Sequence, residues 1–71
     1  NDEEARKLFN EILLREPTYI GSYYHLGKLL ERVGDYDKAI RIYKRGIEEA
    51  QKANDHHTRM ELQGALEDIE E

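Results

Sequence analysis

Residue types that could take part in chemistry are concentrated between Tyr23 and Tyr43, a stretch with four tyrosines, two lysines and one histidine. Just before this stretch, Ser22 stands three residues ahead of His25, a spacing that would bring a serine nucleophile and a histidine base to one side of a helix. Acyl transfer would also need an orienting acid, a nucleophile elbow and an oxyanion hole, and the sequence shows no pattern typical of them. We therefore expect no catalytic residue, and an enzyme is the least favoured class of function.

Metal binding is the second chemistry that the sequence suggests, because His56 and His57 follow Asp55. Neighbouring side chains on a helix point about 100° apart, so the two histidines cannot simply share one ion. Asp55 with His56 could contribute to an adventitious zinc or nickel site at a seam between copies. Polar residues at the start of a helix are the simpler interpretation, and we expect neither a metal nor a cofactor.

Composition limits the partners. Seventy-one residues form at most one small domain, and 38% of them are charged with a net charge of −5. Nucleic acid is disfavoured because phosphate contacts need clustered cations, whereas the basic residues from Lys38 to Arg45 alternate with apolar ones.

No apolar run reaches the roughly 20 residues of a membrane helix, so we expect no membrane partner. With no cysteine and no signal-like segment, the sequence favours a cytoplasmic protein.

Apolar residues recur at three- and four-residue steps, which is the helix period, and no segment alternates as a strand would. The breakers are Pro17, Gly34-Asp35 and Asn54-Asp55. Together with the helix period, these helix-breaking residues predict an all-α chain with helices near 3–15, 19–33, 36–53 and 56–70. The apolar stripe of the second range is expected to end at Val33, and Met60 is expected to point away from the stripe of the fourth.

Each break carries residues that end or begin helices. Gly34 and Asn54 tolerate the left-handed conformation found after a helix end. Asp35 and Asp55 can accept hydrogen bonds from the free amides of the next helix, and Thr18 can do the same after Pro17.

The first and third helices repeat at a fixed distance of 34 residues, since Ala5, Phe9 and Leu13 match Ala39, Tyr43 and Ile47. The unit between them reads Tyr23-x2-Leu26-Gly27-x2-Leu30 followed by Ala39-x3-Tyr43. Both the period and the pattern resemble the tetratricopeptide repeat, a helix-turn-helix unit. Leu30 replaces an aromatic residue of that pattern, and Gln51 stands where proline would end the repeat.

The chain also resembles the C-terminal part of small bacterial tetratricopeptide-repeat proteins in which an extra helix follows the last repeat. This resemblance implies an antiparallel helix-turn-helix α-solenoid fragment of about four helices. Residues 1–17 would be the second helix of a truncated repeat, residues 18–53 a complete repeat with an extended second helix, and residues 55–71 a C-terminal capping helix.

In this family the first helix of each repeat lines a concave groove that holds peptides or partner surfaces. The resemblance therefore implies a set of outward-facing groove residues on the helix near 19–33: Gly21, Tyr24, His25, Lys28, Glu31 and Arg32. An ordinary solvated face, with Glu31 neutralising its neighbours, is the alternative. The Lys and Asn set by which some members clamp a C-terminal carboxylate is not reproduced.

The first helix lacks the partner helix that a full repeat would give it, so part of its apolar surface needs a cover. We expect a second copy to supply it, as a symmetric dimer or by helix exchange, over Leu8, Phe9, Ile12 and Leu14. The sequence thus predicts a protein–protein interaction module that binds a protein or peptide through the groove and the first helix. The alternative is a structural unit, designed or excised, whose main partner is itself.

Overall fold

The structure, a computed structural model, describes residues 2–15 and 20–70, apart from the side chains of Asp2, Phe9, Ile12 and Leu13. Within these residues the chain forms four α-helices and no strand. They are α1 (Asp2–Arg15), α2 (Ile20–Arg32), α3 (Tyr36–Lys52) and α4 (His56–Ile69). The all-α expectation is confirmed, and each predicted range agrees with its helix to within one residue at the ends that are described.

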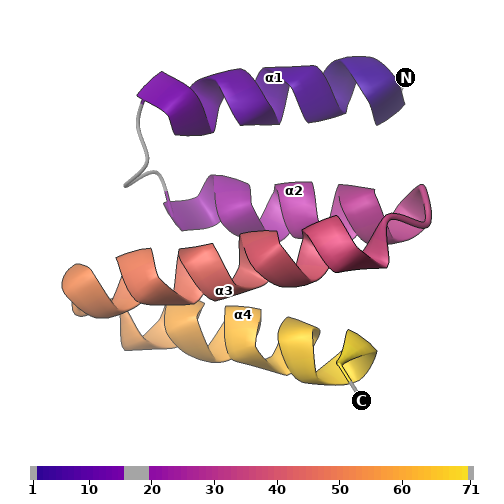
Figure 1. Cartoon of the computed structure of the whole chain (residues 1–71). Coiled ribbons are helices and arrows are strands. Elements are labelled where there is room, and N and C mark those ends of the chain that lie inside the picture. The colour runs from indigo at the N-terminus through magenta and orange to yellow at the C-terminus, as the bar shows by residue number, and fades with distance from the viewer. Residues whose placement is uncertain (1, 16–19, 71) are drawn as a thin grey trace.

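Consecutive helices run antiparallel and lie side by side, from α1 at one edge to α4 at the other (Figure 1). α2 packs against both α1 and α3, while α4 packs against α3 and, less extensively, α2. Among the described helices, α1 contacts α2 alone. The Cα atoms span 32 × 31 × 15 Å, so the helices form a flat arrangement with two broad faces.

The turns after α2 and α3 have the same backbone geometry. Gly34 has a left-handed φ of 85°, and the amide of Asp35 donates to the carbonyl oxygen five residues earlier at 2.8 Å. Asn54 has a left-handed φ of 58°, and the amide of Asp55 makes the equivalent bond at 2.9 Å. These bonds satisfy carbonyl groups that a helix end would otherwise leave without donors, and the two left-handed residues are those that the sequence predicted.

Aspartate begins both following helices. Oδ1 of Asp35 accepts from the amide of Lys38 at 3.3 Å, and Oδ1 of Asp55 accepts from the amide of Thr58 at 3.1 Å. Both predicted caps are confirmed, while the cap predicted at Thr18 lies outside the described residues.

The apolar stripe on α2 does not extend to Val33, where the sequence predicted its end. Val33 lies in the turn after the helix and is 46% exposed, because the chain already departs from the helix toward the left-handed Gly34. On α4, Met60 is 66% exposed and points away from the buried residues, as predicted.

The hydrophobic core lies among α2, α3 and α4. Its buried members are Tyr23, Leu26, Leu30, Ala39, Tyr43, Leu62, Ala65 and Leu66. Two glycines allow the helices to approach closely: a Cβ atom on Gly27 would overlap the ring of Tyr43, and one on Gly46 would lie 2.6 Å from Cβ of Tyr23. The close contact of α2 with α3 therefore depends on the missing side chain of Gly27.

Candidate partner-binding face

The six residues predicted to line a groove all lie on α2 and are called here the groove face: Gly21, Tyr24, His25, Lys28, Glu31 and Arg32. Gly21, His25 and Arg32 are exposed, whereas Tyr24, Lys28 and Glu31 are half-buried. The burial of Tyr24 has a clear cause, because its ring packs against the hydrophobic core. The groove face thus combines freely accessible side chains with others that the fold holds in place.

Four neighbouring side chains of the groove face form a continuous series of contacts. The rings of Tyr24 and His25 meet edge to face, with centroids 6.0 Å apart and planes 82° apart. The ammonium group of Lys28 lies 5.6 Å from the centre of the Tyr24 ring, within the range of a cation–π interaction. The same ammonium group lies 3.7 Å from Oε2 of Glu31.

This series is attached to the core through Tyr43 of α3. The hydroxyl of Tyr43, whose side chain is fully buried, donates a hydrogen bond to Oε2 of Glu31. Burial raises the pKa of the Tyr43 phenol, and the bond to the Glu31 carboxylate raises it further. The phenol therefore stays protonated and remains a donor at neutral pH, which fixes Glu31 and, through it, Lys28.

Gly21 and Arg32 lie in the first and last turns of α2, away from the centre of the series. A Cβ atom on Gly21 would meet nothing within 4 Å, so the backbone there is accessible to another chain. Neither of the two clefts described in the structure is lined by a groove-face residue. In the single chain, the described groove-face residues therefore form an accessible surface outside both clefts.

The fold and this surface can be compared with known proteins. The sequence profile of the tetratricopeptide repeat matches residues 3–60. The chain belongs to the tetratricopeptide repeat family. The resemblance inferred from the 34-residue period is thereby confirmed.

Solved structures of tetratricopeptide repeat proteins support the same assignment. The crystal structure of a tetratricopeptide repeat domain protein from Salinibacter ruber is 43% identical over 99% of this chain and 78% of that chain, with a TM-score of 0.93. A solution NMR structure of a tetratricopeptide repeat domain protein from Salinibacter ruber gives 43% identity over 99% of this chain and 71% of that chain, with a TM-score of 0.95. No curated protein sequence matches the chain.

Tetratricopeptide repeats are generally protein-interaction modules, and their fold is typically a non-catalytic scaffold. None of the helices in the described residues combines the length and apolar character needed to cross a membrane. Likewise, the described residues contain no group of three or more His, Cys, Asp or Glu side chains that could hold a metal ion.

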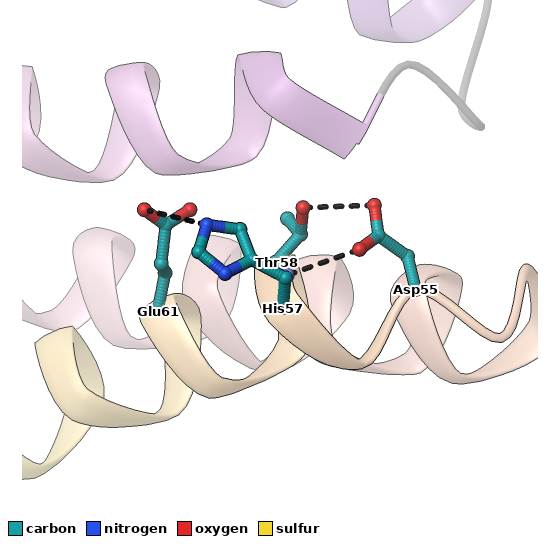
Figure 2. A network of polar contacts seen from close by, with 4 residues as sticks. All are labelled: Asp55, His57, Thr58 and Glu61. Carbon is teal, nitrogen blue, oxygen red and sulfur yellow. Dashed lines mark hydrogen bonds and ion pairs between the residues drawn. The ribbon is translucent and has the colours of Figure 1, made fainter.

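The polar residues around the start of α4 have a structural role in this repeat protein. Oδ1 and Oδ2 of Asp55 accept from the amide and the hydroxyl of Thr58, at 3.1 and 2.8 Å, and His57 Nε2 lies 3.7 Å from Oε2 of Glu61 (Figure 2). Hydrogen bonds from Thr58 lower the pKa of the Asp55 carboxyl group. Asp55 is therefore engaged in beginning the helix, which agrees with the simpler of the two interpretations of this segment.

The predicted self-association surface on α1 is only partly described. Leu8 and Leu14 are 57% and 83% exposed, while the side chains of Phe9 and Ile12 lie outside the described set. The expectation that α1 carries exposed apolar residues holds for both leucines.

The bond between Tyr43 and Glu31 was not predicted from the sequence, where Tyr43 was named only as a residue of the repeat pattern. A usable signal was present, because a buried tyrosine hydroxyl normally needs a hydrogen-bond partner.

Proposed function

We propose that this tetratricopeptide repeat chain is a protein-interaction module that holds a partner polypeptide against the groove face of α2 and performs no catalysis. The observation that supports this best is the series of contacts from His25 through Tyr24 and Lys28 to Glu31. It presents an aromatic ring, a cation and a carboxylate in fixed relative positions on a family of folds that generally binds proteins.

Fixed side chains favour binding because less conformational entropy is lost when a partner arrives. Immobilising a flexible side chain at an interface costs roughly 0.5–1.5 kcal/mol. Lys28 is already restrained by Glu31, and Glu31 by the buried hydroxyl of Tyr43. In the proposed complex Tyr24 is the apolar anchor, and Lys28 and Arg32 orient the partner by pairing with a carboxylate.

A random peptide library tests this proposal, because selection from it does not require the natural partner. Peptides selected on the wild-type domain are measured against the double variant Tyr24→Ala/Lys28→Ala and against Lys7→Ala, a matched control on the exposed side of α1. We expect the double variant to lose most of the affinity and the control to retain it, with helical content unchanged in both. Unchanged affinity of the selected peptides for the double variant would show that they bind elsewhere.

A second candidate function is self-association through α1, which we propose to use Leu8, Phe9, Ile12 and Leu14. Two observations favour it: Leu8 and Leu14 are exposed, and α1 contacts α2 alone among the described helices. Sedimentation of the wild type and of the Leu8→Glu/Leu14→Glu variant is the test. A dimer that becomes a monomer in the variant supports this function, whereas a wild type that is monomeric at high concentration contradicts it.

Two further assignments remain part of the proposal. Residues 18–53 form the complete repeat, preceded by the second helix of a truncated repeat in residues 1–17 and followed by a capping helix in residues 55–71. A cytoplasmic location fits the absence of cysteine from the sequence.

A further inference from the structure

A cleft of about 240 Å³ lies between α1 and α3. Its described lining residues come from three helices: Asn10 and Leu14 of α1, Tyr23 of α2, and Lys38, Ile42 and Arg45 of α3. None of these residues belongs to the groove face. The cleft is therefore a separate place at which another molecule can contact the domain.

The two cations that line this cleft, Lys38 and Arg45, lie on one face of α3 together with Arg41, which lines a second cleft. Lys38, Arg41 and Arg45 are spaced by three and four residues, so their side chains follow the same side of the helix. None of the three forms an ion pair with a carboxylate of the described residues. Two acidic residues follow on that side. Glu48 and Glu49 line a second cleft together with Arg41 and Arg45, and Oε2 of Glu49 lies 3.8 Å from the ammonium group of Lys52.

This row of three cations contrasts with the chain as a whole, which has a net charge of −5. A local positive surface on an acidic protein attracts acidic partners and repels basic ones. Charge therefore selects an acidic occupant for the cleft.

Size and apolar content narrow the choice further. Sites for drug-sized ligands usually measure about 300–1,000 Å³, so this cleft suits a single side chain better than a cofactor. Leu14 and Ile42 supply apolar walls from opposite helices, and Leu14 is 83% exposed. An inserted apolar side chain would remove this leucine from water and gain hydrophobic stabilisation.

We propose that the cleft between α1 and α3 binds an acidic peptide segment of a partner protein. One bulky apolar side chain of the segment enters between Leu14 and Ile42, and flanking carboxylates pair with Lys38 and Arg45. This site is independent of the proposed groove-face function, because the two sets share no residue.

The probe for this site is a fluorescein-labelled peptide with a central phenylalanine and two glutamates on each side. Two control peptides replace the glutamates by lysine or the phenylalanine by alanine. Fluorescence anisotropy is measured with the whole domain at low and high salt. We expect only the parent peptide to bind measurably, with an affinity that falls as salt increases.

Charge variants then locate the bound peptide. Arg45→Gln is expected to weaken binding by up to about fivefold, the range for loss of an exposed charge pair, and Lys38→Glu by more, because an attraction becomes a repulsion. Lys7→Glu makes the same change of charge as Lys38→Glu on an exposed residue that lines neither described cleft, and should leave affinity unchanged. Circular dichroism establishes that each variant keeps the helical content of the wild type.

Three results would overturn the proposal. An equal loss of peptide affinity in Lys7→Glu would show that binding depends only on the overall charge of the domain. If Tyr24→Ala/Lys28→Ala no longer bound the peptide while Lys38→Glu bound it with full affinity, the peptide would lie on the groove face. That result would support the proposed groove-face function instead. Failure of the peptide to bind, together with a change of oligomeric state in Lys38→Glu, would show that a second copy of this chain occupies the cleft.

Discussion

The buried hydroxyl of Tyr43 donates a hydrogen bond to the carboxylate of Glu31, so a core residue of α3 holds a surface residue of α2. A functional face is usually described by its exposed atoms. Here the positions of Glu31 and Lys28 depend on a phenol that no partner can touch.

Tyr43→Phe tests this dependence. The ring is retained but the donor is lost, and a hydrogen bond to a charged group contributes about 1.5–3 kcal/mol, less where solvent screens the acceptor as at half-buried Glu31. We expect a lower free energy of unfolding in urea and weaker binding of groove-face peptides. Tyr36→Phe, at a tyrosine that is 52% exposed, is the matched control and should change neither.

Alkaline pH should destabilise the domain through its buried tyrosines. Burial is the largest cause that raises the pKa of both Tyr23 and Tyr43 above the ordinary value of 10.0. A raised pKa in the folded state gives stability that is complete below the unfolded pKa and decreases as pH rises above it. We therefore expect Tm to fall above about pH 10, and to fall less steeply in Tyr43→Phe. A Tm that is constant to pH 11 in the wild type would contradict the assignment.

Gly27→Ala should destabilise the contact between α2 and α3, because the added Cβ would overlap the ring of Tyr43. Overpacking of this kind costs about 1–3 kcal/mol, which thermal or urea unfolding can measure. Gly64→Ala on α4 is the matched control. Its Cβ would meet nothing within 4 Å, and alanine favours a helix over glycine by about 1 kcal/mol. The two substitutions are expected to have opposite signs, and equal effects would contradict the close contact at Gly27.

Asp55 should make the start of α4 sensitive to acid. Hydrogen bonds from Thr58 lower the pKa of its carboxyl group below 3.8, so its contribution is present above that pH and is lost as pH falls through the folded pKa. We expect Asp55→Ala to have a lower Tm than the wild type at neutral pH. Asp55→Asn keeps an oxygen acceptor but does not titrate, so its Tm should depend less on pH in the acid range. Circular dichroism over pH 2–7 distinguishes the three proteins.

The helices could be predicted because the residues at each helix end determine where that helix begins or ends. Gly34-Asp35 and Asn54-Asp55 supply the left-handed residue and the acceptor that each turn uses, and the 34-residue period supplied the family. Val33 shows the limit of this approach, since an apolar residue at a helix end continues the stripe in sequence but not in space.

The features that could not be predicted from the sequence depend on how the helices rotate and approach one another. Leu29 is buried although it lies outside the pattern Tyr23-x2-Leu26-Gly27-x2-Leu30, and its helix, α2, packs against α1 as well as α3 and α4. The bond from Tyr43 to Glu31 joins residues 12 positions apart on different helices. The cleft beside Lys38 is lined by residues of three helices. None of these follows from a single helical period.

Among the described helices α1 packs against α2 alone, and this has a consequence for the order in which the molecule opens. A helix that packs against one neighbour can detach while α2, α3 and α4 keep their shared core. Amide protons of α1 should therefore exchange with deuterium before those of the other three helices. A ligand that bridges α1 and α3 would close this route and slow the exchange, so protection of the α1 amides would report occupancy of the cleft directly.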